Sequence, residues 1–277
     1  MERMFTVSQV AAMLGLGIDA VRFYEKKGLV HPQINPENRY RMYSLYQIME
    51  LLDVSYYRSL GMSISEIRSI SKDCDEKQLI DLLREKRLET QRKLRYEQQM
   101  LKRIEYVEAL TQRMKERGQG VDVVEVPSSY ILFEQREDSL EDYLTQVSGM
   151  DHDHYIFCQL AREFSLEETA DTALCCVPTR TLLLMNCSTA RELDSPASQN
   201  KVLPGMRALH SIVQLPNADL RREDVASMLE TARRQGLRLE HRLLMREVPM
   251  ISYTDLAHYY AELFIPLAEP EQEPEDK

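Results

Sequence analysis

The sequence predicts an α + (α+β) chain, with a small helical domain, one long helix, and a larger domain that mixes helices and strands. Three observations predict this order. Residues 18–43 form a helical stretch followed by a basic, aromatic stretch interrupted by prolines. Residues 76–117 contain neither Gly nor Pro and are rich in strong helix formers. Residues 119–277 alternate between strand-like and helical runs. We therefore expect domains at residues 1–75, 76–118 and 119–277.

Length and composition favour a globular protein of about two domains. The chain has 277 residues, of which 43% are hydrophobic and 29% are charged. No apolar run approaches the ~20 residues of a membrane span, and the first residues lack the apolar core of a signal peptide. Five cysteines without framework spacing favour reduced thiols. We expect a cytoplasmic protein with no membrane partner, no metal and no other cofactor.

Charge is distributed unevenly between the two parts of the chain. Residues 1–118 contain 21 Lys or Arg and 17 Asp or Glu, whereas residues 119–277 contain 14 and 28. The front part could therefore contact DNA, and the acidic back part could favour cationic ligands. The alternative for the back part is that its acidic surface serves solubility alone.

Two short helices are expected near the N-terminus. The first covers Ser8–Leu14, after a short strand at Phe5–Val7, and Gly15 ends it. The second is bounded by Gly17 and Gly28. Two short helices joined by a three-residue turn are typical of a helix-turn-helix, whose second helix enters the major groove of DNA.

The second helix carries residues suited to DNA contact. Ile18, Asp19 and Ala20 lie near its N-terminus, from which side chains can reach base edges. Arg22 and Tyr24 are better placed for phosphates.

A basic, aromatic stretch follows this helix, and Pro32 prevents the helix from continuing into it. Guanidinium and phenol groups alternate there as in a short strand, and such groups contact phosphates and stack on sugars. The candidate contacts are Arg39, Tyr40, Arg41 and Tyr43. The alternative is a small packing element with solvated charges, and composition alone favours neither interpretation.

Two capping boxes predict the starts of the next two helices. Ser44 with Gln47 opens the first, and Ser63 with Glu66 opens the second, which we expect to cover Ile64–Ile70.

The stretch Glu76–Arg117 predicts one helix of roughly 60 Å. Apolar residues recur along it at helical spacings: Leu79, Leu83, Leu94, Leu101, Ile104, Val107 and Met114. A stripe this long needs a partner helix, because one small domain cannot cover it. Charged residues interrupt the heptad, so the sequence predicts pairing without fixing a register. A solvated single helix is the disfavoured alternative.

The remaining residues predict two strand-helix-strand-strand halves, roughly 121–187 and 202–267. The expected strands are Tyr130–Gln135, Tyr155–Phe164, Ala173–Val177, Thr181–Cys187, Val202–Leu215, Leu237–Glu247 and His258–Leu267, and the expected helices are Leu140–Val147 and Asp219–Gln235.

The last expected strand suggests a ligand site. Alternation places Glu262 on one strand face between the rings of Tyr260 and Phe264. A carboxylate flanked by aromatic rings suits a lipophilic organic cation. The other candidate ligand residues are Glu247, His241, Tyr143, Tyr155, Phe157 and Tyr253. The alternative is that Glu262 is a solvated edge residue and the rings only cover the sheet.

The N-terminal residues resemble the signature of the MerR family of transcription regulators. The resemblance covers about 70 residues and is carried by Arg22-Phe23-Tyr24-Glu25, Gly28-Leu29-Val30, Pro32, Arg39, Tyr40-Arg41, Tyr43 and the run LGMSISEI. It implies a winged helix-turn-helix followed by an antiparallel coiled-coil dimerisation helix. Phe23 stands where Tyr is common, and Asn38 stands where many members carry Gly. Asn38 also tolerates the left-handed conformation that the wing turn needs. Arg58 resembles the basic residue that contacts the DNA backbone beside the wing.

The C-terminal residues resemble the GyrI-like effector-binding domain of multidrug-sensing MerR proteins. The resemblance rests on the runs LRLEHRLLM and YYAELFIPL and on the order of elements. It implies an α+β domain with an antiparallel sheet and places Glu262 at the position of a cation-facing glutamate. The family's His-x-Gly-x-Tyr stretch is poorly kept around His210.

Together the resemblances imply a homodimeric, ligand-responsive activator that is not an enzyme. It would bind a pseudo-palindromic operator in double-stranded promoter DNA, and a small lipophilic cation would make it distort that DNA so that RNA polymerase can engage the promoter. Three alternatives stay open: a constitutive regulator whose C-terminal domain binds no ligand, a GyrI-like module that hydrolyses or sequesters small molecules, and an acidic domain that docks a protein.

Overall fold

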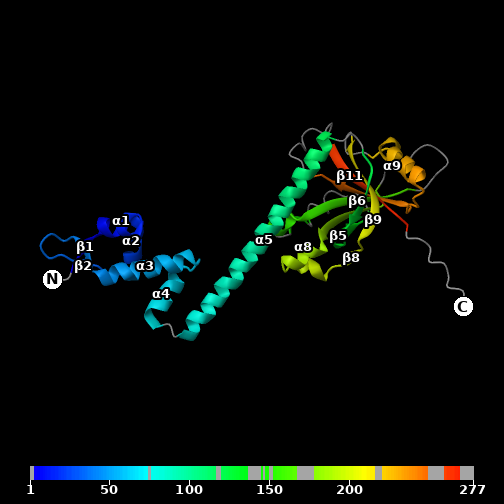
Figure 1. The fold of residues 1–277 in the computed structure, drawn as a ribbon. Coiled ribbons are helices and arrows are strands. Elements are labelled where there is room, and N and C mark those ends of the chain that lie inside the picture. The colour runs from blue at the N-terminus through cyan, green and yellow to red at the C-terminus, as the bar shows by residue number, and fades with distance from the viewer. Residues whose placement is uncertain are drawn as a thin grey trace. The chain divides into compact units, whose positions relative to one another are not determined.

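The computed structural model describes residues 3–73, 76–116, 120–136, 145, 147–149, 152–166, 178–215, 220–248 and 259–268. The chain divides into two compact units, Met1–Lys93 and Leu94–Lys277. The division falls inside one long helix (Figure 1). We call these parts unit 1 and unit 2 and describe each by itself.

Unit 1 combines short helices with a small three-stranded sheet, whose strand order is β1-β3-β2. Its elements are β1 (Phe5–Thr6), α1 (Val7–Leu14), α2 (Ile18–Lys26), β2 (Gln33–Ile34), β3 (Arg41–Tyr43), α3 (Leu45–Ser59), α4 (Ile64–Asp73) and the first part of α5 (Glu76–Glu116). The predicted helix-turn-helix is therefore confirmed, and a hairpin follows it as the wing.

Caps fix several of the helix ends in unit 1. Ser44 and Gln47 form the predicted capping box at α3, and Gly15 ends α1 with a φ of 64°. A capping box that we did not predict, between Thr6 and Gln9, starts α1. For this reason the predicted strand Phe5–Val7 ends one residue early, and Val7 is helical.

Two small apolar clusters form the core of unit 1. One cluster joins α1, α2, α3 and the sheet, and its fully buried members include Val10, Val21 and Leu51. The other lies around Met62 and Ile67, between α3 and α4. The half-buried ring of Tyr24 contacts both clusters, so α2 is held from two sides.

Unit 2 contains one eight-stranded antiparallel sheet with helices, together with the second part of α5. The strand order is β4-β9-β11-β10-β6-β7-β5-β8. The elements are β4 (Asp122–Val126), β5 (Ser129–Gln135), α7 (His152–Tyr155), β6 (Cys158–Ser165), β7 (Arg180–Asn186), α8 (Cys187–Glu192), a 3-10 helix (Pro196–Gln199), β8 (Val202–Leu203), β9 (Met206–Leu215), α9 (Arg222–Gln235), β10 (Arg242–Glu247) and β11 (Tyr259–Pro266).

The sheet is built from two halves, as predicted, but each half contributes four strands rather than the three of the predicted strand-helix-strand-strand pattern. Read outward from the central pair of β10 and β6, one half is β10-β11-β9 and the other is β6-β7-β5. The outermost strands are exchanged, because β4 pairs with β9 of the second half and β8 pairs with β5 of the first. This exchange ties the two halves together at both edges.

Several predicted strand limits were wrong because turns interrupt them. Tyr155 belongs to α7, so β6 begins only at Cys158. The side chain of Asn186 caps α8, so Cys187 is helical. A break at Gly205 divides the predicted strand Val202–Leu215, and a Cβ at this glycine would lie 3.0 Å from the carbonyl oxygen of Val126.

Two further strand predictions have different outcomes. The predicted strand Leu237–Glu247 begins only at Arg242, because a turn follows the left-handed Gly236 that ends α9. The predicted strand Ala173–Val177 lies outside the described residues, as does most of the predicted helix Leu140–Val147.

Side chains on the two faces of the sheet enter different clusters. On β11, the odd residues Ala261, Leu263 and Ile265 join a core that includes residues of α9. The even residue Phe264 belongs to a second cluster on the opposite face. Glu262 shares this opposite face, and Tyr106 of α5 donates a hydrogen bond to it there.

Candidate functional site

Helix α2 carries six of the eleven residues predicted to contact DNA, and four of these six are exposed. Ile18, Asp19, Arg22 and Phe23 are exposed, and Ala20 and Tyr24 are half-buried. Val21 has no exposed surface, so it holds the helix against the core. The helix therefore presents its N-terminal residues and Arg22 outward, as a recognition helix must.

The wing is a hairpin of β2 and β3 whose tip is exposed. Arg39, rather than Asn38, adopts the left-handed conformation in the wing turn, with a φ of 56°. Instead the side chain of Asn38 accepts a hydrogen bond of 3.0 Å from the backbone N–H of Tyr40. Arg39 and Tyr40 are consequently displayed at the tip, where Tyr40 is 65% exposed.

An ion pair connects the wing to α2. The Nε of Arg41 donates to both carboxylate oxygens of Glu25, each at 2.8 Å. This contact raises the pKa of Arg41, mainly through the hydrogen bond with Glu25. Arg41 remains exposed, so it can position the wing against the helix and still lie at the same surface.

Tyr43 corrects the predicted DNA surface. Its side chain has no exposed surface and belongs to the core of unit 1. The reason is that Tyr43 pairs with Phe5 at the centre of the three-stranded sheet, where its ring faces the helices. A contact between Tyr43 and DNA is therefore excluded in this structure.

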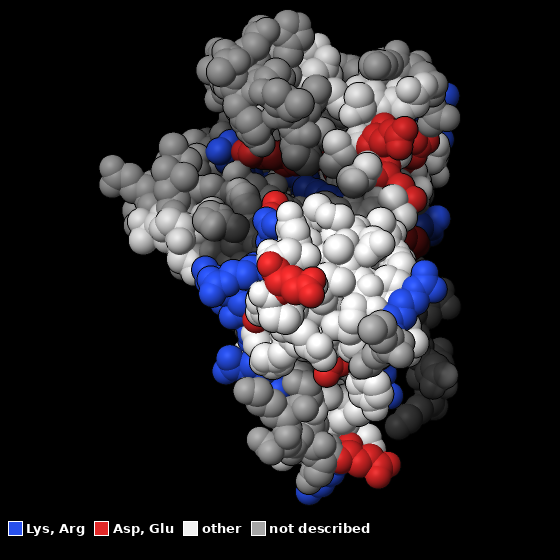
Figure 2. Space-filling view, turned by 90° about the vertical axis from the view of Figure 1, so that its left-hand side faces the viewer, with Lys and Arg blue, Asp and Glu red and all other residues white. Residues whose placement is uncertain are grey.

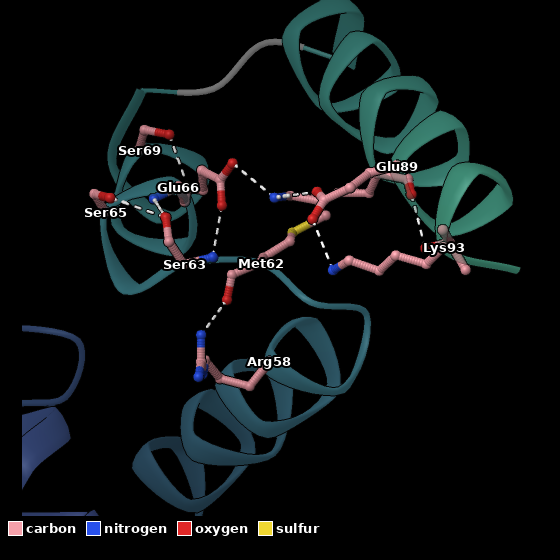
Figure 3. A network of polar contacts seen from close by, with 10 residues as sticks. Arg58, Met62, Ser63, Ser65, Glu66, Ser69, Glu89 and Lys93 are labelled. Carbon is pink, nitrogen blue, oxygen red and sulfur yellow. Dashed lines mark hydrogen bonds and ion pairs between the residues drawn. The ribbon is translucent and has the colours of Figure 1, made fainter. Parts of the chain in front are cut away.

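Arg58 stabilises the end of α3. Its Nη1 donates to the carbonyl oxygen of Met62 at 2.5 Å, as Figure 3 shows. The residue is otherwise exposed. Its predicted contact with the DNA backbone remains a prediction, to which the structure adds a role in joining α3 to α4.

A polar network joins α4 to α5 within unit 1 (Figure 3). Ser63 and Glu66 form the predicted capping box, since each backbone N–H donates to the other's side chain. The Nζ of Lys86 lies 3.2 Å from Glu66 and 3.3 Å from Glu89, which also pairs with Lys93 at 2.9 Å. The cap therefore continues into a row of ion pairs on α5.

We expect Ser63→Ala to lower the free energy of unfolding of unit 1 by about 1 kcal/mol, because it removes the N-terminal cap of α4. Ser65→Ala is the matched control, since Ser65 is exposed and, within the described part of the chain, its side chain hydrogen-bonds with the hydroxyl of Ser63 alone. Urea denaturation followed by circular dichroism measures both. Equal stability of the two variants would contradict a role for this cap.

Exposed apolar residues form a stripe along α5. Its members fall on two positions of one seven-residue repeat: Ile80, Leu83, Leu94, Leu101 and Ile104. Each side chain is between 37% and 57% exposed. A stripe of this kind is typical of a helix that pairs with another helix.

A second exposed apolar stripe lies on α3. Leu45, Met49, Leu52 and Tyr56 follow one helical face and are between 44% and 63% exposed. Figure 2, which looks from the left-hand side of Figure 1, shows mostly uncharged residues across the middle of the visible face, with acidic residues among them and Lys and Arg at its margins. The exposed residues of α3 therefore add an apolar stripe to the surface of unit 1.

In unit 2, the predicted ligand residue Glu262 lies in a buried polar cluster. It is 4% exposed and accepts a hydrogen bond at Oε1 from Nε2 of His210, 3.0 Å away. The hydroxyl of Tyr106, on α5, donates to Oε2. Arg113 Nη2 lies 3.5 Å from Nδ1 of His210, and because a guanidinium only donates, this contact favours the proton on Nε2.

Each cation of this cluster faces a carboxylate, since Arg113 pairs with Asp122 at 2.9 Å and Arg246 lies opposite Glu262. Burial alone would raise the pKa of Glu262, but the bonds from His210 and Tyr106 and the charge of Arg246 lower it below its ordinary value. Burial and the carboxylate also raise the pKa of Tyr106. Glu262 is therefore ionised, and Arg246, directly opposite it on β10, is the buried cation nearest in register.

The aromatic part of the predicted site is present in part. The ring of Phe264 stacks on that of His210 with centroids 4.7 Å apart, and Arg246 lies over the same ring at 4.7 Å. Tyr260 is half-buried and donates to Gln214 at 3.4 Å. Glu262 is consequently not the solvated edge residue of our alternative interpretation.

The other predicted ligand residues lie elsewhere. His241 is exposed in the turn before β10, and Glu247 pairs with Arg162 at 3.7 Å on the opposite sheet face. Tyr155 and Phe157 enter a separate apolar cluster, where Phe157 packs edge-on against Tyr96 of α5. The structure therefore does not bring these four residues to Glu262. Tyr143 and Tyr253 lie outside the described residues.

A cavity of about 790 Å³ lies at the end of the sheet, away from Glu262. It is lined by residues of the turn before β9, the end of α9 and the start of β10, including Arg207, Arg238 and Arg242. Two of these arginines pair with glutamates that also line it, Arg207 with Glu125 at 3.9 Å and Arg242 with Glu240 at 2.6 Å. Its charges are therefore largely matched.

Two of the five cysteines, Cys158 and Cys187, lie among the described residues. No group of three or more His, Cys, Asp or Glu there could hold a metal ion. Cys158 and Cys187 are buried free thiols, and burial raises the pKa of Cys158 to about 12. In the described part of the chain, no helix has both the length and the apolar character needed to cross a membrane.

Comparison with known proteins gives the class of the N-terminal part. Residues 5–74 match the family model described as MerR HTH family regulatory protein. The regulator CueR of Escherichia coli O6:H1 is 42% identical over 60 residues, which cover 22% of this chain and 44% of that protein. The Multidrug-efflux transporter 2 regulator of Bacillus subtilis is 27% identical over 93 residues, 34% of each chain. Unit 1 therefore contains a MerR-family helix-turn-helix.

These two matches cover 22% and 34% of this chain. The chain spans less than half the length of each of these curated relatives. A solved structure, the EcmrR–DNA complex in EcmrR-RPo, is 20% identical and covers 95% of this chain and 99% of that chain, with a TM-score of 0.39.

Proposed function

We propose that this protein is a transcription regulator that binds promoter DNA through α2 and the wing. The observation that carries the proposal is the MerR-family match over residues 5–74, together with an exposed surface that combines Arg22, Arg39 and Tyr40. Phosphate contacts from such groups position a protein on the duplex, and the residues at the start of α2 reach the base edges.

The regulator acts as a homodimer in this proposal. The heptad stripe of α5 is exposed in the single chain, and an antiparallel second copy of the same helix would cover it. The apolar stripe on α3 would also become buried in the dimer. Two copies of α2 related by two-fold symmetry would bind a pseudo-palindromic operator.

Unit 2 is the effector-sensing part. We propose that a small lipophilic cation binds on the sheet face that carries Glu262, as the resemblance to GyrI-like domains implies. Support comes from the ionised, buried carboxylate of Glu262 and from the ring of Phe264 beside it. The hydrogen bond between Glu262 and Tyr106 gives such a ligand a direct connection to α5.

Effector binding would make the regulator distort the promoter so that RNA polymerase can engage it. Bending and untwisting the DNA of a protein-binding site costs about 1–6 kcal/mol. The effector must therefore bind the distorting state more tightly than the other state by a comparable free energy.

The test of DNA binding uses the full chain and an operator selected from random duplexes. We expect Arg22→Ala to weaken binding by more than about tenfold and to reduce the slope of log affinity against log salt by about 2, because the dimer loses one phosphate contact in each of its two copies. Fluorescence anisotropy at several salt concentrations measures both quantities.

The matched control is Arg234→Ala, which removes an exposed arginine from α9 in unit 2. We expect its affinity and salt slope to equal those of the unchanged protein. Failure to select any duplex, or equal binding by Arg22→Ala and the unchanged protein, would contradict the proposed DNA surface.

A further inference from the structure

Arg246 occupies the position that a bound cation would take beside Glu262. It is 7% exposed and lies directly opposite Glu262 in the pairing of β10 with β11. Its guanidinium stands 4.7 Å from the centroid of Phe264. A cation over an aromatic ring beside a carboxylate is the arrangement that the sequence predicted for a ligand.

The contacts of Arg246 differ from those of a structural arginine in the same sheet. Arg180 makes a dense set of charge-assisted bonds, two to Glu163 at 2.8 and 2.9 Å and one to Glu134 at 2.8 Å. Among the described residues, Arg246 has neither a hydrogen bond nor an ion pair, and its buried Nε is without a partner. A guanidinium offers five donors, so its burial without bonds costs free energy.

Two cations cannot share this site with a single carboxylate. Glu262 and Arg246 carry opposite charges, while His210 and Tyr106 serve Glu262 as hydrogen-bond donors. Adding a second buried cation would leave one positive charge uncompensated, which is unfavourable in a low-dielectric interior. A cationic effector therefore enters only if the guanidinium of Arg246 leaves the ring of Phe264.

We propose that Arg246 is an internal cation that competes with the effector and sets its specificity. The proposal rests on the proposed cation-sensing function of unit 2. The effector class that it predicts is a large aromatic cation with dispersed charge, which buries more apolar area on the ring than a guanidinium does. Small hydrated cations bind less well, because they replace the charge of Arg246 but not its contact with the ring of Phe264. Neutral molecules bind less well, because they replace the ring contact but not the charge.

The experiment compares two probes of equal shape and opposite charge, tetraphenylphosphonium and tetraphenylborate, by calorimetric titration of the full chain. We expect Arg246→Met to bind tetraphenylphosphonium at least about tenfold more tightly than the unchanged protein, because the competing cation is gone. Binding of tetraphenylborate should not improve. Arg246→Gln, which keeps a polar group in the cluster, should show the same direction if Arg246→Met fails to fold.

Arg162→Met is the matched control. Arg162 lies on the neighbouring strand β6, also has a buried Nε without a partner, and points to the opposite face of the sheet. We expect this variant to bind tetraphenylphosphonium as the unchanged protein does.

Each outcome decides the proposal. If the unchanged protein binds tetraphenylphosphonium and both Arg246 variants bind it no more tightly, Arg246 is no competitor, although the cation-sensing function stands. In another outcome the unchanged protein binds tetraphenylborate more tightly than tetraphenylphosphonium, and this preference is lost in Arg246→Met. That outcome would make Arg246 the counter-ion of an anionic ligand and would overturn the inference. If no folded variant binds tetraphenylphosphonium, the inference and the cation-sensing function both fail.

Discussion

Leu101→Glu is expected to convert the protein from a dimer into a monomer and thereby to abolish operator binding. Leu101 lies in the exposed heptad stripe of α5 and is 56% exposed in the single chain. In a two-fold dimer the substitution occurs twice, and each copy loses about 2 kcal/mol of apolar burial and adds a charge. The dimerisation constant should therefore weaken more than about 100-fold. Sedimentation velocity measures the change in mass.

The loss of DNA binding follows from symmetry. A monomer presents one copy of α2 and one wing, so it contacts one half of a pseudo-palindromic site. In an anisotropy titration, the Leu101→Glu variant should bind the selected operator no more tightly than it binds an unrelated duplex, although unit 1 remains folded.

Leu88→Glu provides the control for this prediction. Leu88 is also an exposed leucine of α5, with 50% of its surface exposed, but it falls outside the heptad stripe. The same charge at this position should leave both the dimer and the operator affinity unchanged. A Leu101→Glu variant that still sediments as a dimer would show that α5 pairs through another face, or not at all.

The elements that the sequence predicted well are those with signals close together in the chain. The capping boxes at Ser44 and Ser63 each involve residues three positions apart, and both are present. The helix predicted over Glu76–Arg117 is observed as Glu76–Glu116, since nothing in that stretch interrupts the backbone hydrogen bonds. Local chemistry decides such features before tertiary packing acts.

Tyr43 shows why a local signal can mislead. The stretch Arg39–Tyr43 has the composition of a wing strand, and we predicted that all its basic and aromatic residues would lie on the DNA-binding surface. The strand β3 is short and lies between β1 and β2, so its last residue is already within the core. Which residues are displayed therefore depends on the neighbouring strands, which composition does not show.

The partners of Glu262 could not have been found in the same way. Alternation along β11 correctly placed Glu262 and Phe264 on one face. Tyr106 lies 156 residues away and His210 lies 52 residues away, and the register of the sheet and the position of α5 bring them together. The one available sequence signal was His210, which stands where the resembling family keeps a histidine motif.

Glu262→Gln is expected to destabilise unit 2 by about 3 kcal/mol, because it leaves Arg246 buried without a counter-charge and weakens two hydrogen bonds. Native-state hydrogen exchange of the β9 and β11 amides measures this loss within the full chain. Adding Arg246→Met should recover part of the stability, since the unpaired cation is then removed as well.

Glu240→Gln is the matched control for the lost carboxylate. Glu240 pairs with Arg242 at 2.6 Å, but the pair is partly exposed and water replaces much of the interaction. Its effect should stay within about 0.5 kcal/mol. Equal exchange rates in Glu262→Gln and Glu240→Gln would mean that the buried cluster does not stabilise unit 2.

Glu262→Gln should also change how the stability of unit 2 depends on pH. The folded-state pKa of Glu262 lies below its ordinary value of 4.5, so its stabilising contribution is present above pH 4.5 and is lost as the pH falls toward the folded-state pKa. Urea midpoints of the unchanged protein should therefore fall more steeply below pH 4.5 than those of Glu262→Gln, which has no proton to bind at this position. Parallel pH profiles would show that His210, Tyr106 and Arg246 do not lower the pKa of Glu262 in the folded protein.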